Sequence, residues 1–377
     1  MYNKLNRKRS WVEIDLELLY SNYMIYSKLF APSTEVMAVV KADAYGHGAV
    51  EVCRKLMAIG VELFAVSNID EAIELRKKDI TGEILVLGYT SIECVDELYR
   101  YGITQTLLSE EYAEKIKNAG LDIKCQFAID TGMNRIGLNA ADENTCEEII
   151  RKYADELNLN GIFTHLCVAD SDSFENKEYT QKQVSLFETV AERVSDLKLR
   201  YIHCMNSAGG LFCKLPKITN CIRLGIIMYG LKPDTSNILP DGIEPVLSWK
   251  SVVSMVKQIS CGESIGYGRT FFAEKTMWIA TIPTGYADGY RRDLSNKGYV
   301  LLHGYKAPIV GRICMDQMMV DVTVIKEAGQ DVNVGDEVVL IGKSGEYQIT
   351  ADDMGEMIGT IGYEIVCGIS KRVPRKY

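Results

Sequence analysis

This chain of 377 residues lacks the features that mark secreted, membrane-spanning or disulfide-rich proteins. Its eleven cysteines are scattered without any C-x-x-C pair or metal-ligand spacing. Such an odd, unpaired set is typical of free thiols in a reducing compartment. No apolar run approaches the length that spans a bilayer, and no signal peptide is recognisable. Together these absences predict a cytoplasmic protein.

An excess of positive charge is also missing. Lys and Arg number 42 against 51 Asp and Glu, for a formal net charge of -9. Because no basic field offsets phosphate repulsion, this composition argues against a nucleic-acid partner. The exception is a basic cluster at residues 4–9. It is either a solvated terminus or a juxtamembrane stretch, in which case the chain is the cytoplasmic domain of a longer membrane protein.

What the chain does contain, from residue 35 to about 230, is a regular alternation of short apolar runs with amphipathic stretches. Eight strand-plus-helix units in succession are typical of a (β/α)8 barrel. The predicted strands are 35–40, 63–66, 84–87, 103–108, 123–129, 159–165, 200–203 and 221–228. The predicted helices include 49–59, 69–78, 92–101, 110–119, 144–155 and 182–194.

The pattern changes after about residue 240, where β-branched residues, period-2 alternation and glycine turns predict a β-rich second domain. Its expected strands are 247–257, 277–282, 299–302, 307–310, 318–324 and 336–341, followed by a helix at 351–358 and a final strand at 362–370. The fold class is therefore α/β: a TIM-type barrel over residues 1–240 and a mostly antiparallel β domain over 241–377. The early strand 11–16 alternates too strictly for a buried parallel strand, so we expect it to pair with the β domain.

The most informative stretch runs from Val40 to Ala49 and reads VKADAYGHGA. Lys41 follows a buried strand, where desolvation lowers the pKa of an amine and makes it a nucleophile or a base. Gly46 and Gly48 then permit a tight turn. An isolated lysine at this place more often points into solvent, but the whole string resembles the pyridoxal-phosphate attachment segment of alanine racemases.

The resemblance extends from Trp11 to about Arg375 through several separate motifs. It implies a Schiff base between Lys41 and pyridoxal 5'-phosphate (PLP). It also implies two bases for proton transfer, Lys41 and Tyr267, with Tyr267 entering the site of the partner subunit in a homodimer. The other residues that the resemblance assigns to the cofactor are Tyr45, His165, Asn206, Ser207, Arg223, Gly225, Ile226 and Tyr363. Those that it assigns to the substrate are Arg135, Met315, Tyr286 and Tyr363.

Arg223 controls the electronics of such a site. By resemblance it pairs with the pyridine nitrogen of the cofactor, and a guanidinium does not surrender its proton. The ring nitrogen then stays largely unprotonated, and the cofactor becomes a weaker electron sink. This favours rapid reprotonation of the substrate, which suits a racemase.

Two departures from the family pattern stand out. Many alanine racemases carry a carbamylated lysine paired to the arginine, where this chain has Ala128, so Arg135 needs another partner such as an anion or an acid. After His165 the family usually shows Phe-Ala, whereas Leu166-Cys167 here is similar to the serine racemases linked to vancomycin resistance. Tyr363, in contrast, is the residue found in alanine racemases.

Three interpretations therefore remain open. The first is an alanine racemase that supplies D-alanine for peptidoglycan. The second is a serine or dual serine/alanine racemase, the catalytic module of a membrane-anchored vancomycin-resistance protein. The third is a fold-type III decarboxylase or a PLP-carrying barrel without catalysis. The β domain argues against a carrier, and Tyr363 and Tyr286 would block the long basic substrates of the decarboxylases.

Overall fold

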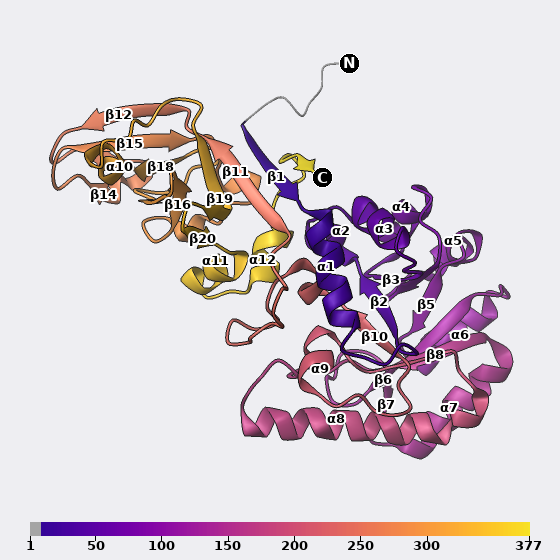
Figure 1. Ribbon diagram of the computed structural model, residues 1–377. Coiled ribbons are helices and arrows are strands. Elements are labelled where there is room, and N and C mark those ends of the chain that lie inside the picture. Colours follow the sequence, from indigo (N-terminus) through magenta and orange to yellow (C-terminus); the bar gives the residue numbers. More distant parts are fainter. Residues whose placement is uncertain (1–8) are drawn as a thin grey trace.

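The computed structural model describes residues 9–377 and consists of a parallel barrel joined to a mostly antiparallel β domain (Figure 1). This confirms the predicted fold class. The first strand, β1 (Ser10–Ile14), and the last, β21 (Arg375–Lys376), lie side by side and pair in parallel.

The barrel strands follow one another in a parallel circuit in which β10 pairs with β2. Two backbone hydrogen bonds of 3.0 Å, from Asn220 N to Ile202 O and from Arg223 N to Met205 O, connect β10 with the chain around β9 and complete the ring. The members in order are β2 (Glu35–Val39), β3 (Leu63–Val66), β4 (Glu83–Val86), β5 (Thr104–Leu107), β6 (Lys124–Asp130), β8 (Asn158–Phe163), β9 (Tyr201–His203) and β10 (Cys221–Leu224), with the short β7 (Leu138–Asn139) paired to β6.

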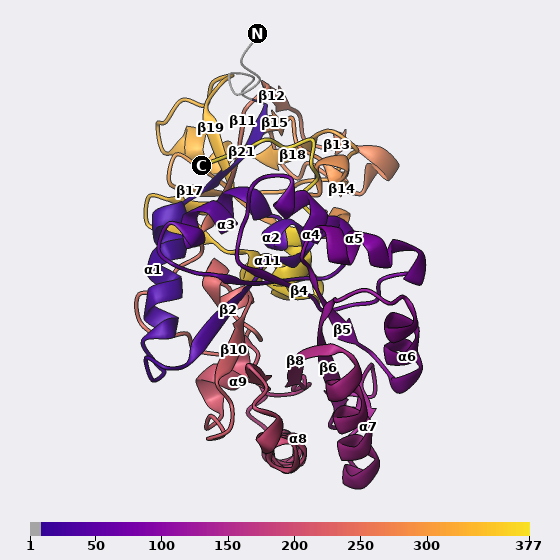
Figure 2. The same ribbon diagram turned by 90° about the vertical axis from the view of Figure 1, so that its right-hand side faces the viewer.

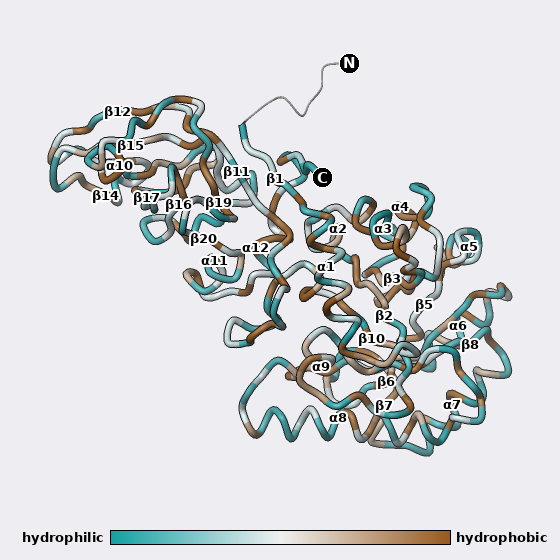
Figure 3. Tube along the Cα trace, viewed as in Figure 1, coloured by the Kyte–Doolittle hydropathy of each residue, from teal (hydrophilic) through white to brown (hydrophobic). Residues whose placement is uncertain are grey.

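Helices surround the barrel because each connection must return the chain to the start of the next parallel strand. These helices are α1 (Leu16–Ser27), α3 (Ala49–Met57), α4 (Ile69–Arg76), α5 (Val95–Arg100), α6 (Glu110–Asn118), α7 (Glu143–Glu156), α8 (Phe174–Arg193) and α9 (Ser207–Phe212). The element α2 (Lys41–Tyr45) is a short left-handed turn just after β2. Figure 3 shows many hydrophilic residues along the outer helices such as α7 and α8, whereas the residues of the barrel strands are mostly buried.

The β domain is built on a sheet with the order β17-β16-β19-β11-β1-β21 and on two smaller sheets. The strand β1 pairs antiparallel with β11, and Trp249 on β11 is fully buried and donates from Nε1 to Ser10 Oγ at 2.8 Å. The strands of this domain are β11 (Leu247–Val252), β12 (Met255–Ile259), β13 (Ser264–Ile265), β14 (Phe271–Phe272), β15 (Met277–Ile282), β16 (Tyr299–Leu302), β17 (Tyr305–Pro308), β18 (Met318–Asp321), β19 (Glu337–Ser344) and β20 (Tyr347–Ile349).

One predicted strand is wrong. The segment predicted as a final strand, 362–370, forms the helix α12 (Gly362–Cys367), which follows α10 (Thr323–Glu327) and α11 (Ala351–Ile358). Its adjacent residues Ile365 and Val366 are both buried. A short apolar pair of this kind fits a helix face as well as a strand, so periodicity alone does not separate the two.

The helices α11 and α12 lie between the sheets of the β domain and the barrel (Figure 2). This places α12 against α2, and Val366 O lies where a side chain on Gly46 would stand. Elements of the C-terminal third of the chain therefore form one wall of the barrel mouth.

Most of the basic cluster predicted as a solvated terminus or a juxtamembrane stretch lies outside the described residues. Its last member, Arg9, is described and forms an ion pair with the buried Asp288. Among residues 9–377, no helix combines the length and the apolar character needed to cross a membrane.

Candidate active site

A cavity of about 440 Å³ opens at the carboxyl ends of the barrel strands, the end at which barrel chemistry gathers. It brings together ten of the predicted site residues, which are far apart in the sequence, with further residues that were not predicted. The predicted site residues that line it are Lys41, Tyr45, Arg135, His165, Asn206, Ser207, Arg223, Gly225, Ile226 and Tyr363.

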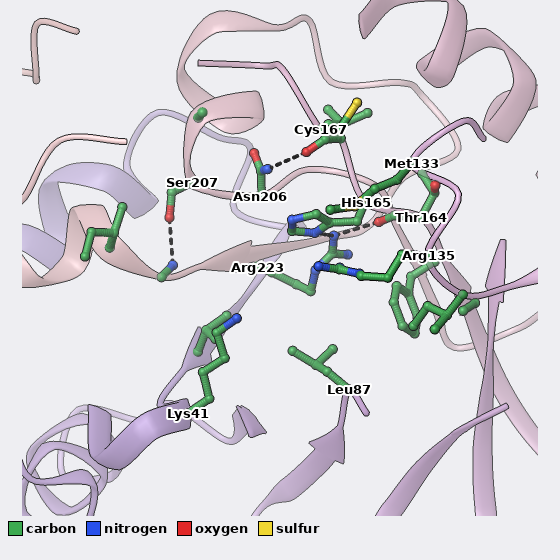
Figure 4. Close-up of a pocket in the computed structure, with 18 of the residues that line it drawn as sticks. Lys41, Leu87, Met133, Arg135, Thr164, His165, Cys167, Asn206, Ser207 and Arg223 are labelled. Carbon is green, nitrogen blue, oxygen red and sulfur yellow. Dashed lines mark hydrogen bonds between the residues drawn. The ribbon is translucent and has the colours of Figure 1, made fainter. Parts of the chain in front are cut away.

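Lys41 extends from the end of β2 into this cavity and points toward Arg223 and His165 (Figure 4). Burial lowers the pKa of the Lys41 amine, and the positive charge of Arg135 lowers it further. Both effects disfavour the ammonium form and so favour the neutral amine, which is the form that acts as a nucleophile or a base.

The chain turns sharply after Lys41. Residues Ala42–Tyr45 all have φ between 53° and 55°, in the left-handed region. This conformation costs about 1–2 kcal/mol for each residue with a side chain. Gly46 and Gly48, with φ of 81° and 95°, complete the turn as predicted. Backbone strain of this size persists only where surrounding contacts enforce it, and it is concentrated at functional sites.

The part of the cavity wall around Gly225 presents hydrogen-bond donors and has no side chain at its centre. Ser207 Oγ accepts from the Gly225 amide at 2.8 Å (Figure 4). A Cβ atom on Gly225 would lie 2.8 Å from the Tyr45 hydroxyl and 3.6 Å from Ser207 Oγ. Ile226 begins a short 3-10 helix directly after this glycine. Hydroxyls and backbone amides around an open glycine form a cradle for an oxyanion such as phosphate.

Arg223 forms the floor of the cavity and is only 3% exposed. Its Nη2 donates to Thr164 O at 2.7 Å, and its Nη1 donates to His203 Nδ1 at 2.7 Å. Burial lowers the pKa of Arg223 to about 10, so it remains a cation at neutral pH. Burial, with Arg223 beside it, lowers the pKa of His165 to about 3 and keeps that ring neutral.

The sequence motifs contained His203 but gave it no role. It is fully buried, and burial together with Arg223 holds its pKa well below 6.5. The neutral ring accepts from Arg223 at Nδ1, so its Nε2 donates to Gln126 Oε1, 2.8 Å away. Gln126 and His203 thus orient the arginine from beneath.

A second missed residue is Gln183 on α8, which is fully buried. Its Oε1 accepts from the amide of Cys167 at 3.1 Å, and its Nε2 donates to Thr131 Oγ1 and to His165 O at 3.2 Å each. It therefore ties together the loops that follow β6 and β8. A glutamine in the middle of a helix carries no motif signal, because its partners lie at least sixteen residues away.

Arg135 lies at the rim of the cavity, and no residue in the described range forms a hydrogen bond with its guanidinium. The loop that presents it is shaped by Asp130, whose Oδ1 accepts from the amides of Gly132 at 2.9 Å and Asn134 at 3.0 Å. Ala128, at the position of the family's carbamylated lysine, is buried and also lines the cavity. The side chain of Arg135 thus faces the cavity with its donors available.

Tyr267, Met315 and Tyr286 lie on the β domain and do not line this cavity. They are 71%, 53% and 41% exposed in the single chain. The loops carrying Tyr286 and Met315 are joined by backbone bonds from Tyr286 N to Cys314 O at 3.0 Å and from Ala287 N to Met315 O at 2.9 Å. Of the two predicted proton-transfer bases, the cavity of one chain therefore contains the lysine but not the tyrosine.

Comparison with known families agrees with this arrangement over nearly the whole chain. Residues 14–233 match the family model described as alanine racemase, N-terminal domain, and residues 246–377 match alanine racemase, C-terminal domain. The chain belongs to the alanine racemase family. The resemblance seen in the sequence motifs is confirmed.

Individual relatives show the same extent of similarity. The chain is 42% identical to alanine racemase 1 of Clostridium acetobutylicum, over 97% of this chain and 95% of that protein. It is 39% identical to the alanine racemase of Halothermothrix orenii, over 100% and 98%. The crystal structure of alanine racemase from E. faecalis superposes with a TM-score of 0.91 at 34% identity, covering 99% of each chain.

Enzymes of the alanine racemase family depend on PLP, and the cavity fits that cofactor. An amine with a lowered pKa stands on one side, and the cradle around Gly225 offers hydroxyl and amide donors for a phosphate. The Arg223 cation lines the same cavity (Figure 4). The residues that would hold PLP are Lys41, Tyr45, His165, Asn206, Ser207, Arg223, Gly225, Ile226 and Tyr363.

Proposed function

We propose that this protein is a PLP-dependent racemase that interconverts L- and D-alanine. The observation that carries the proposal is the convergence of the Lys41 amine, the Gly225 cradle and the buried Arg223 cation in one cavity of a chain from this family. Isomerisation of an amino acid needs no further substrate, so one cavity that holds the cofactor and the amino acid is sufficient.

The proposed mechanism uses two bases, one on each face of the substrate. When bound, PLP withdraws electrons from the Cα–H bond of an attached amino acid and makes that hydrogen acidic. The Lys41 amine, whose pKa is lowered, takes or returns this proton on one face. The partner subunit's Tyr267 serves the other face. Arg223 holds the floor of the cavity as a cation and donates hydrogen bonds without releasing a proton.

A homodimer with shared sites follows from this division of labour. Tyr267, Met315 and Tyr286 are exposed side chains on the β domain, and none of them lines the cavity of its own chain. In the proposed dimer, the surface that carries these three residues packs against the barrel mouth of a second copy and completes its site. In the proposed dimer, the Met315 amide and Arg135 bind the substrate carboxylate, and Tyr286 lines the side-chain pocket.

The two residues that resembled serine racemases, Leu166 and Cys167, have contacts of their own within the barrel. Leu166 is buried, and its carbonyl accepts from Asn206 Nδ2 at 3.0 Å. The Cys167 thiol donates to Gln183 Oε1 at 3.3 Å, so it is engaged with α8. Both residues line the cavity and also hold neighbouring elements in place. The relatives named above are alanine racemases, and none of them supports the serine alternative.

We further propose that the enzyme works in the cytoplasm and supplies D-alanine for peptidoglycan. The free state of the cysteines is consistent with a reducing compartment, since no two of them form a disulfide.

The test is a side-by-side measurement of kcat/KM for L-alanine and L-serine with purified enzyme and PLP, with D-product separated by chiral chromatography. We expect alanine to be preferred by about 10-fold or more, because the small pocket disfavours the added hydroxymethyl oxygen. A preference for serine, or no D-product from either amino acid, contradicts the proposal.

A further inference from the structure

The strained turn after Lys41 is held at its first residue by a side chain from the neighbouring barrel unit. Glu71 lies on α4, which follows β3, and its Oε1 accepts from the Ala42 amide at 2.8 Å. Its Oε2 accepts from the Ser67 amide at 2.7 Å. One carboxylate therefore connects the residue after Lys41 to the residue after β3.

This use of Glu71 departs from what its position in α4 would favour. Asn68 caps the helix by accepting from the Glu71 amide at 3.0 Å, so Glu71 occupies the third helical position. A glutamate there usually completes a capping box by binding back to the amide of the cap residue. Here its two oxygens instead reach Ser67 and Ala42.

Other contacts hold the far end of the turn. The ring of His47 lies with Nδ1 2.9 Å from Ala44 O and 3.0 Å from Tyr45 O, so Nδ1 is the protonated nitrogen. Arg375 donates from Nε to Gly46 O at 3.1 Å. These bonds act on the carbonyls of residues 44–46, whereas Glu71 is the side chain that binds the backbone directly after Lys41.

We propose that Glu71 is a positioning residue for cofactor binding: by holding the Ala42 amide it fixes the left-handed turn and thereby the placement of Lys41 and Tyr45. The proposal rests on the proposed PLP site. A relaxed turn would move the attaching amine and the Tyr45 hydroxyl of the cradle together, because the four left-handed residues lie between them. Loss of Glu71 therefore weakens the binding of PLP to the apoprotein.

A carboxylate suits this task because two N–H donors require two acceptor oxygens. Glu71→Gln keeps the size of the side chain but turns one acceptor into a donor that faces an N–H group. Glu71→Asp keeps the charge but is one methylene too short to span both amides. Glu74→Gln is the matched control, because Glu74 is exposed on the same helix. This substitution removes the same charge without affecting the contacts of the turn.

Loss of the negative charge of Glu71 would by itself strengthen PLP binding, opposite to the expected effect of a relaxed turn. The negative charge of Glu71 raises the pKa of Lys41. Its removal would leave more of the amine unprotonated and favour attachment of PLP. A loss of affinity in Glu71→Gln therefore reports on the geometry of the turn.

The experiment titrates each apoprotein with PLP, follows the absorbance of the bound cofactor, and records the thermal midpoint of the same apoproteins. We expect Glu71→Gln and Glu71→Asp to bind PLP about 10- to 100-fold more weakly, as for loss of a charge-assisted hydrogen bond. Their apoprotein midpoints should stay within about 3 °C of wild type, and Glu74→Gln should match wild type in both measurements.

Two results would overturn the inference. One is wild-type affinity, within about twofold, in both Glu71 variants. The other is a loss of affinity no larger than that of Glu74→Gln. If Glu71→Gln fails to fold, Glu71→Asp alone decides between these outcomes. Failure of the wild-type apoprotein to bind PLP would instead contradict the proposed function, so the two failures are distinguishable.

Discussion

Single side chains in the cavity derive their chemistry from what surrounds them. Lysine and arginine side chains are both ordinarily cations at neutral pH. Burial lowers the pKa of Lys41 and of Arg223, but from different starting values. The lysine is brought toward the range where it exchanges protons, whereas the arginine stays charged. The roles proposed for them, as base and as fixed cation, agree with this difference.

Tyr363 tests how the pocket selects its substrate. It projects from α12 into the cavity, with its ring 6.0 Å from that of Tyr45, and burial raises the pKa of its hydroxyl. Tyr363→Asn opens space and supplies an amide that can bind a serine hydroxyl. We expect the serine-to-alanine ratio of kcat/KM to rise by about 10- to 100-fold, measured with both L-amino acids. An unchanged ratio would show that Tyr363 does not set selectivity.

Buried histidine predicts a pH dependence of stability. Burial lowers the pKa of His47 to about 4, so below about pH 6.5 the unfolded chain binds a proton that the folded chain does not. The free energy of unfolding therefore has its full value, as far as His47 is concerned, above pH 6.5. It falls by about 1.4 kcal/mol per pH unit as the pH decreases toward 4. His47→Gln should make the decline in unfolding free energy between pH 6.5 and pH 4.5 shallower by this amount in urea titrations. An identical slope in wild type and variant contradicts the assignment.

At the residue scale, the sequence predicted the members of the cavity better than it predicted their supports. Lys41, His165 and Arg223 stand in motifs at strand ends, and parallel strands in a barrel bring such ends together. His203 and Gln183 act through partners dozens of residues away, and Glu71 through an amide 29 positions earlier. Such contacts arise from packing and leave no local pattern.

At the scale of elements, two loops of the β domain are fastened by one buried carboxylate. Asp288 is fully buried, and its Oδ2 accepts from the Gly285 amide at 3.0 Å. Its Oδ1 accepts from Arg372 Nε at 2.6 Å, and Arg372 Nη2 donates to Asp316 Oδ1 at 2.6 Å. The loops carrying Tyr286 and Met315 are therefore held in one arrangement.

Asp288→Asn should loosen both loops. Burial alone would raise the pKa of Asp288, but the hydrogen bonds from Arg372 and Arg9 hold it below its usual value, so the residue is a carboxylate at neutral pH. Removing the charge should cost about 1–3 kcal/mol of stability, because the arginines remain partly exposed. We expect a lower thermal midpoint and a higher KM for alanine at unchanged PLP affinity.

The matched control is Asp293→Asn, which removes an exposed carboxylate 3.5 Å from Arg291 in the same domain. Surface pairs of this kind contribute little, so this variant should match wild type. A KM for Asp288→Asn equal to that of the control would show that Asp288 does not influence substrate binding through the loops that carry Tyr286 and Met315.

Elements were predicted well where the pattern was long and regular. The barrel strands agree with the predicted runs to within a few residues, because a buried parallel strand is a short apolar run between turns. The helix α12 was mistaken for a strand, and α1 was not predicted at all. The buried face of α1 consists of Leu19, Asn22, Tyr23 and Tyr26. Its polar and aromatic members hide the apolar period that identifies a helix.

At the scale of the whole molecule, the proposed activity belongs to a pair of chains. The cavity of one chain contains Lys41, whereas Tyr267 is 71% exposed on the β domain. The resemblance implies that Lys41 and the partner subunit's Tyr267 serve one site, but the structure of one chain does not test which copy supplies each. That assignment is a matter of assembly and requires two chains.

Subunit mixing tests this assignment. Lys41→Ala and Tyr267→Phe should each be inactive, since each lacks one of the two bases. After exchange of subunits, a hybrid dimer contains one site with both bases intact and one with neither. We expect racemisation to recover to about a quarter of the wild-type rate at equal mixing, estimated from random pairing. No recovery after verified exchange would mean that both bases come from the same chain.

The most direct test of the central claim, that Lys41 carries the cofactor of a racemase, is borohydride reduction of the PLP-loaded protein followed by peptide mapping. Reduction fixes the cofactor to the lysine that holds it. We expect a single pyridoxyl label on the peptide that contains Lys41, and loss of both the label and racemisation in Lys41→Ala. A label on another lysine, or full racemisation by Lys41→Ala, would contradict the claim.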